Sequence, residues 1–178
     1  HFLNVLNLKK LTNKNMVYTA KHYLRGLLRI TMGWIFLWAF LDKLFGLGFA
    51  TEAGKSWLDG TSPTTGFLKF GTSGPLSTFF QSLASNMLVD WLFMLGLLLI
   101  GLALILGIAM RLACWSGALL MLLMYVAILL PEHNPIIDEH IIYLLVLLLL
   151  LKTKAGYPLG LGGWWSNLNL VQKAKWLQ

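Results

Sequence analysis

"WLFMLGLLLIGLALILGIAM", residues 91–110, and "LACWSGALLMLLMYVAILLP", residues 112–131, are the two stretches that decide the fold. Each is twenty residues long, and neither contains a charged side chain. Twenty residues of α-helix cover about 30 Å, the thickness of the hydrocarbon core of a bilayer. Because only Arg111 separates the two runs, we expect a tight hairpin of two membrane-spanning helices.

Two further spans are predicted on either side of this hairpin. "ITMGWIFLWAFL" (30–41) is too short alone, but it spans if it is extended and if Arg29 and Lys43 snorkel toward opposite interfaces. The last span has "IIYLLVLLLLL" as its core. The expected fold class is therefore all-α, an integral membrane four-helix bundle forming a single membrane domain over residues 1–178. The expected spans are about 23–47, 89–110, 112–131 and 138–154.

Composition and charge agree with a membrane protein. The 178 residues are 57% hydrophobic and only 12% charged, whereas a soluble domain carries about twice that fraction of charge. The net charge of +7 comes from lysines and arginines that flank the spans, so it indicates contact with lipid headgroups rather than with nucleic acid. Residues 1–21 are polar and basic and lack a secretory pattern.

The basic residues also predict the topology. Six lysines and arginines precede the first span, Arg111 lies between the second and third, and four lysines follow the last. These positions share one side of a four-span protein, so both termini are expected in the cytoplasm. The other side then receives residues 131–138 and a long loop, 48–88, in which 76–88 is a candidate interfacial helix. The tail, 157–178, has tryptophans beside lysines and is expected to be an interfacial helix.

The scarce ionisable groups gather at the expected outer ends of the spans. "PEHNPIIDEHIIY" (131–143) holds three of the seven acidic residues and two of the four histidines. With groups from spans one and two it predicts one outer polar cluster, because ionisable residues inside spans are costly and commonly functional. Its expected members are Asp42, Lys43, Asp90, Asp138, His140 and Tyr143.

Structural roles are the alternatives for these residues. Asp138 opens a helix and suits an N-cap, and Glu139 suits the positive end of that helix. Asp42 and Lys43 also suit interface positions where they pair with headgroups or with each other. Glu132 and His133 are expected in a solvated loop, since no close ligand spacing indicates a metal there.

Glycines and one cysteine complete the pattern. Arg29, Gly33, Phe36, Phe40 and Lys43 share a stripe of the first span, where Gly33 permits close helix approach. Gly101 and Gly107 offer the same in the second span, and Arg111 suits a positive-inside turn. Cys114 is alone and expected to be buried and inert, so we expect no disulfide, haem or iron–sulfur cluster in this chain. Redox chemistry would then use a diffusible or partner-held cofactor.

Three spaced motifs resemble the DoxX/DoxD family of small four-helix membrane proteins. They are Arg29-x3-Gly33-x2-Phe36-x5-Asp42-Lys43-Leu44-x-Gly46, then Gly101-x5-Gly107-x3-Arg111, then Asp138-x-His140-x2-Tyr143. The resemblance covers about residues 22–155, and the loop with "SWLDG" (56–60) is more similar to the DoxD branch. DoxD is the large subunit of thiosulfate:quinone oxidoreductase, which oxidises thiosulfate to tetrathionate and passes electrons to membrane quinone, with DoxA as its small companion.

The resemblance implies a membrane redox subunit in a prokaryotic cell membrane. The catalytic set would be His140, Asp138, Tyr143, Asp42 and Lys43, with the histidine–carboxylate pair as the proton donor. The thiosulfate dianion would bind at the outer face, near Asp90, to cations and N–H donors. Lys43, Lys55 and Lys69 are the candidate cations, although the acidic 131–138 loop would repel this substrate.

Quinone is the diffusible cofactor that the resemblance implies. It would occupy an apolar cleft lined by Trp34, Trp38 and Phe40, although such aromatics equally suit lipid contact or packing. The expected partners are membrane lipid and a DoxA-like small subunit or another redox partner, with a homo-oligomer as a further possibility. The alternative function is a non-catalytic DoxX-like scaffold that holds a redox partner while the polar cluster fixes helix packing. A solute transporter is disfavoured because the chain has no internal repeat.

Overall fold

The computed structural model describes the backbone of residues 2–131, 134 and 136–177, and the side chains from Ala20 onward except that of Lys175. Glu132 and His133, expected in a solvated loop, lie outside the described residues. Within these ranges the chain forms helices and no strand. Three helical segments are long and apolar enough to cross a membrane, namely Ala20–Phe45, Met87–Leu106 and Met110–Ala127. These segments indicate a membrane protein.

The two decisive stretches form α3 (Met87–Leu106) and α4 (Met110–Ala127). Their connection differs from the expected one. The helices are broken at Gly107, which takes the left-handed conformation with φ 74° and ends α3, while Arg111 lies in the first turn of α4. A side chain at position 107 would meet the carbonyl oxygen of Gly156 at 2.6 Å, so glycine is required there for space as well as for φ.

Helix α1 (Phe2–Phe45) contains the first apolar segment and packs against α3. The two helices approach most closely around Gly33 and Gly101. A Cβ at Gly33 would lie 2.8 Å from the backbone nitrogen of Ile105, and a Cβ at Gly101 would lie 2.8 Å from that of Leu37. The missing side chains therefore allow close backbone contact, which strengthens the van der Waals attraction between the two helices.

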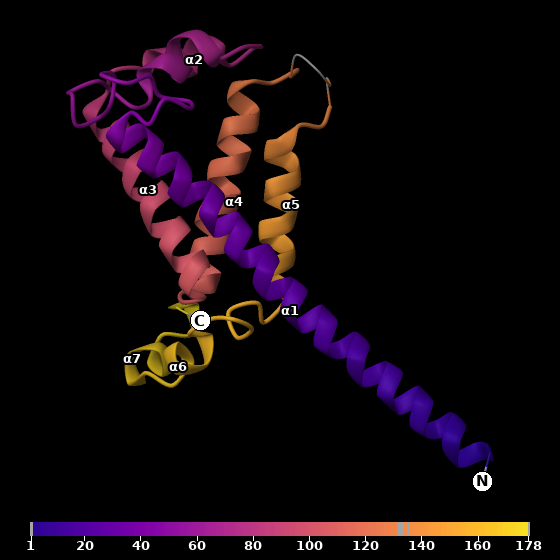
Figure 1. Ribbon diagram of the computed structural model, residues 1–178. Helices are drawn as coiled ribbons and strands as arrows, with labels where there is room; N and C mark the ends of the chain where they lie inside the picture. Colours follow the sequence, from indigo (N-terminus) through magenta and orange to yellow (C-terminus); the bar gives the residue numbers. More distant parts are fainter. Residues whose placement is uncertain (1, 132–133, 135, 178) are drawn as a thin grey trace.

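Helix α5 (Glu139–Lys152) packs along α4 and touches α1 (Figure 1). It has 14 residues, which cover about 21 Å and fall short of the roughly 30 Å hydrocarbon core. A single core joins α1, α3, α4 and α5, and the glycine and alanine positions of α4 let Leu147 pack deeply. Its most buried side chains include Phe36, Leu104, Cys114, Leu147 and Leu150.

The long connection between α1 and α3 folds over the ends of α3 and α4 instead of extending into solvent. It contains a short π-helix, η1 (Phe67–Gly71), and α2 (Ser77–Ser82). Leu68 and Phe80 are buried against Ala127 at the end of α4, and the Ser73 N–H donates to the Ala127 carbonyl oxygen at 2.9 Å. The helix expected over 76–88 is thus two elements, since Asn86 caps the start of α3.

The tail is more broken than the single interfacial helix that we expected. It forms α6 (Gly162–Ser166), α7 (Asn169–Lys173) and a 3-10 turn, η2 (Lys175–Leu177). It folds beneath the turn between α3 and α4, where the Leu161 N–H donates to the Leu106 carbonyl oxygen at 2.8 Å. Glycines at 160, 162 and 163 disfavour a continuous helix and permit this close contact.

Candidate functional site

Asp138 and His140 form a half-buried pair at the start of α5. One carboxylate oxygen of Asp138 accepts the backbone N–H groups of His140 and Ile141, at 3.1 and 3.3 Å, and so caps the helix. The other oxygen lies 2.6 Å from Nδ1 of His140. The capping role and the histidine–carboxylate pair, which the sequence left as alternatives, therefore coexist in one side chain. Holding Nδ1 leaves Nε2 of His140 as the ring atom that can exchange a proton.

Asp42 is buried near the end of α1 and is tied to the chain that follows. Its Oδ1 accepts the Phe49 N–H at 3.2 Å, and its backbone carbonyl accepts the Gly46 N–H at 2.8 Å. Gly46 has φ 66°, which lets the chain leave the helix here. The buried Oδ2 of Asp42 has no partner among the described residues. Lys43 is half-buried beside it, without a salt bridge in the described part of the chain.

Asp90 fastens the long loop to the first turn of α3. Its Oδ1 accepts the hydroxyl of Ser62 at 2.8 Å and that of Thr64 at 2.5 Å. Thr65 extends this network, since its hydroxyl donates to Ser62 at 2.7 Å and accepts the Ser85 N–H at 2.9 Å. The carboxylate is buried and its charge is met by hydroxyl donors, an arrangement that orders a loop.

The six residues predicted as one outer cluster include three carboxylates that are held by local contacts, Asp42 by the chain after α1, Asp90 by the long loop and Asp138 by His140. They do lie at one end of the helices, but the loop after α1 and the start of α5 are on opposite sides of α4 (Figure 1). No hydrogen bond or ion pair in the described ranges joins Asp42, Asp90 and Asp138 to one another. Tyr143 packs against the apolar core. The end of the helix at which each residue lies was predictable, whereas its lateral position depends on how the helices pack.

The candidate substrate lysines lie on three different segments of the chain. Lys55 pairs with Glu52 at 2.7 Å on the exposed loop, and this hydrogen bond and charge hold the pKa of Glu52 below its ordinary value. Lys69 is exposed on η1. Lys43 is at the end of α1, where its carbonyl oxygen accepts the Trp57 N–H at 2.9 Å, so the loop segment that carries Lys55 lies beside it. The thiosulfate site expected at these three lysines stays a prediction.

The aromatic residues expected to line a quinone cleft separate into two faces of α1. Trp34 is 51% exposed and lies beside Trp38, with ring centres 5.8 Å apart. Trp38 also meets Phe49 edge to face at 5.1 Å. Phe40 instead packs against the core. These residues do not fit a common quinone cleft, because positions 34 and 38 share a helix face that position 40 does not.

Arg29 is a buried polar residue whose position differs from the one predicted from the sequence. Expected to snorkel to the interface, it has no exposed surface, and its guanidinium donates to four carbonyl oxygens. Nη1 bonds the Leu104 and Ile105 carbonyls, the latter at 2.8 Å, and Nη2 bonds those of Pro158 and Leu159 at 3.1 and 2.9 Å. The sequence did contain a signal for this burial, because Arg29 is the tenth residue of the apolar segment Ala20–Phe45 and a charge so placed is usually buried with partners.

These bonds complete the C-terminus of α3. The last four carbonyls of a helix lack intrahelical partners. Here the Ala103 carbonyl accepts from Gly107 and Ile108, the Leu104 and Ile105 carbonyls accept from Arg29, and the Leu106 carbonyl accepts from Leu161. All four are satisfied by groups outside the helix, which locks α1, α3 and the tail together.

The motif glycines and Arg111 have structural positions. Gly33 and Gly101 lie at the α1–α3 crossing, Gly46 and Gly107 end helices, and Arg111 is exposed in the first turn of α4. Gly107 and Arg111 also line a cavity of about 430 Å³, at the opposite end of the molecule from Asp138 and His140. In the part of the chain that is described, no three histidine, cysteine, aspartate or glutamate side chains gather as metal ligands would.

Comparison with protein-family models, curated proteins and solved structures finds no match to this chain.

Proposed function

We propose that this chain is a four-pass DoxX/DoxD-like subunit of a prokaryotic cell membrane, with both termini in the cytoplasm. Three apolar helices of spanning length support this proposal, and α5 would make the fourth pass. The exposed apolar residues Ile136 and Ile137 precede α5 and extend its short hydrocarbon length. The lysines and arginines near the start of α1, in the first turn of α4 and after α5 support a shared cytoplasmic side.

The proposed activity is electron transfer from thiosulfate, or a similar small reduced sulfur donor, to membrane quinone. Two thiosulfate ions joined as tetrathionate release two electrons, and a quinone takes up two electrons and two protons to become quinol. The observation that carries the proposal is the 2.6 Å contact between Asp138 and His140. A carboxylate that fixes Nδ1 leaves Nε2 free to face a substrate, where it would be a suitable proton donor at the membrane surface.

A partner is part of this proposal. The aromatic residues expected to line a quinone cleft lie on two faces of α1, and the one cysteine, Cys114, is buried. A DoxA-like small subunit, another redox partner or a second copy of the chain would supply the missing surfaces. The exposed loop around Lys55 and Lys69 is one surface on which such a partner can add N–H donors and cations.

The test is quinol formation by purified protein with its co-purifying partners, supplied with thiosulfate and a soluble quinone. His140→Ala should reduce turnover by about 10²-fold or more, the usual contribution of a positioned acid or base, while His22→Ala on the exposed part of α1 should not. Absence of turnover in wild type with its partners present would rule the reaction out.

The second candidate is the non-catalytic scaffold, which the Asp42 and Asp90 contacts favour. Both carboxylates are used to hold the loop after α1 against the helices, and neither contacts the Asp138–His140 pair. A scaffold predicts that His140→Ala retains the redox partner and all activity of the complex. The oxidoreductase predicts that the partner is retained and the activity is lost, so co-purification and turnover measured together separate the two.

A further inference from the structure

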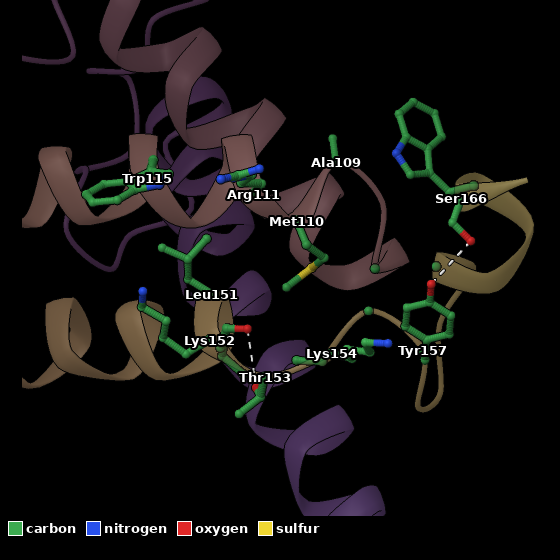
Figure 2. A pocket seen from close by; sticks show the side chains of 16 residues that line it. Ala109, Met110, Arg111, Trp115, Leu151, Lys152, Thr153, Lys154, Tyr157 and Ser166 are labelled. Carbon is green, nitrogen blue, oxygen red and sulfur yellow. Dashed lines mark hydrogen bonds between the residues drawn. The ribbon is translucent and has the colours of Figure 1, made fainter. Parts of the chain in front are cut away.

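A basic pocket lies at the end of the molecule away from the Asp138–His140 pair. We call it the basal pocket and define it by the cavity residues Met110, Arg111, Trp115, Lys152, Lys154 and Tyr157. Figure 2 shows one wall from α4, carrying Met110, Arg111 and Trp115, and a facing wall from the end of α5, carrying Leu151 and Lys152. Lys154, Tyr157 and Ser166 close one side. Its volume of about 430 Å³ suits a small polar group rather than a single ion.

The charged side chains that line the basal pocket are all positive. Three lining side chains are cationic, and no aspartate or glutamate is among its lining residues. The first turn of α4 adds to this, because its N-cap is Ala109, which has no side-chain oxygen to bond the free N–H groups. Two of the opposing carbonyls at the end of α5, those of Leu149 and Leu150, already accept hydrogen bonds. Thr153 donates its N–H to Leu149 and Leu150 and its hydroxyl to Leu150.

Two exposed apolar stripes run from the same pocket along the neighbouring helices. On α4, Trp115 is followed at helical spacing by Leu119 and Leu122, all of them exposed. On α5, Leu149 and Leu145 continue the face of Lys152 and are also exposed. A cationic pocket that opens onto exposed hydrocarbon, with tryptophan and tyrosine at the boundary, has the profile of a membrane interface.

We propose that the basal pocket binds the phosphate group of one anionic phospholipid molecule per chain. Arg111, Lys152 and Lys154 would hold the phosphate, and the acyl chains would lie along the two apolar stripes. Free phosphate and a lipid phosphate offer the same oxygen acceptors, but only the lipid also covers the hydrocarbon beside the pocket. The proposal rests on the placement of the apolar helices and is independent of any redox reaction.

The experiment titrates delipidated full-length protein in detergent with phosphatidylglycerol or phosphatidylcholine and counts bound lipid by native mass spectrometry. We expect one phosphatidylglycerol per chain and at least about tenfold weaker binding of phosphatidylcholine. Arg111→Gln, Lys152→Gln and Lys154→Gln together should weaken phosphatidylglycerol binding about tenfold or more, since each cation near a membrane surface contributes measurably to anionic-lipid affinity.

The matched control removes the same charge elsewhere, through Lys21→Gln, Lys69→Gln and Lys173→Gln at exposed positions outside the pocket. This control should retain the lipid, as should the charge-conserving set Arg111→Lys, Lys152→Arg and Lys154→Arg. Equal losses in both glutamine triples would show a diffuse charge effect and overturn the site. Binding of inorganic phosphate alone with the affinity of the lipid would overturn the lipid assignment. Circular dichroism and gel filtration of each variant report whether it is folded.

Discussion

Arg29 and Leu159 lie 130 positions apart, and Nη2 of Arg29 donates a 2.9 Å hydrogen bond to the Leu159 carbonyl oxygen. Leu159 has φ 53°, a left-handed conformation that residues with a side chain rarely adopt. The arginine thus fixes a strained turn of the tail while it also caps α3. The guanidinium is buried, and four carbonyl oxygens take the place of the water that would otherwise hydrate it. Removing the Arg29 side chain would therefore leave these carbonyls buried and unpaired.

Replacing Arg29 should be among the most destabilising changes in the chain. We expect Arg29→Met to lower the free energy of unfolding by about 3 kcal/mol or more, since several buried acceptors lose their donor at once. Thermal denaturation in detergent, followed by circular dichroism, measures this loss. Arg25→Met is the matched control, because Arg25 donates to the Lys21 carbonyl at 3.3 Å in an exposed position. Equal melting temperatures for the two variants would contradict the capping role.

Gly101 should tolerate no side chain, whereas Gly96 on the same helix should. A Cβ at Gly101 would press on the Leu37 backbone at 2.8 Å, and α1 cannot yield locally. We expect Gly101→Ala to cost about 1–3 kcal/mol, the usual range for overpacking. Gly96→Ala meets nothing within 4 Å and should be neutral or stabilising by up to about 1 kcal/mol through helix propensity. Melting temperatures in the same detergent compare them, and the opposite order would refute this helix crossing.

The two roles of Asp138 can be separated by substitution. Asp138→Ala removes the N-cap of α5 and should cost about 1 kcal/mol of stability, whereas Asp138→Asn keeps an oxygen that caps. Both variants lose the carboxylate that lies 2.6 Å from Nδ1 of His140, so the ring chemical shifts of this histidine should change in each. Histidine NMR at one fixed pH, read together with the melting temperature, checks this. Ring chemical shifts equal to those of wild type in both variants would show that the carboxylate does not contact the ring.

The turn at Ser56–Asp59 should open in acid. The Asp59 carboxylate accepts the Ser56 hydroxyl at 2.5 Å and the Ser56 N–H at 3.0 Å, and these bonds lower the pKa of Asp59 from its ordinary value. A lowered folded-state pKa stabilises the turn fully above the ordinary pKa, and this stabilisation is lost as the pH falls through the folded value. Amide hydrogen exchange across 56–60, corrected for intrinsic rates, should therefore accelerate below about pH 4.

Asp59→Asn serves as the control for this acid opening. It replaces the titrating carboxylate with an amide, so its turn should exchange at a corrected rate that no longer depends on pH in this range. An equal acid response in wild type and Asp59→Asn would assign the opening to another group, such as Glu52, whose pKa is lowered by Lys55.

The sequence by itself determined where the hydrocarbon helices lie. Residues 91–110 and 112–131 contain no charged side chain. In a bilayer, an isolated apolar segment of this length can satisfy its backbone hydrogen bonds only as a helix. Asp138, which follows Pro135 in the sequence, likewise predicted a cap from local chemistry alone. These are properties of single segments, and both appear in the structure.

Tertiary structure decided what the polar residues do. Periodicity predicts which end of its helix each of Asp42, Asp90 and Asp138 occupies but not the lateral distance between them, and the loop after α1 and the start of α5 lie on opposite sides of α4 (Figure 1). From the sequence, Arg29 could lie at an interface or be buried with hydrogen-bond partners. Its four carbonyl acceptors come from the C-terminus of α3 and from the tail, and only the tertiary structure brings these segments together around it. Arg111, a simple turn residue in the sequence, becomes a wall of the basal pocket because the ends of α4 and α5 meet there.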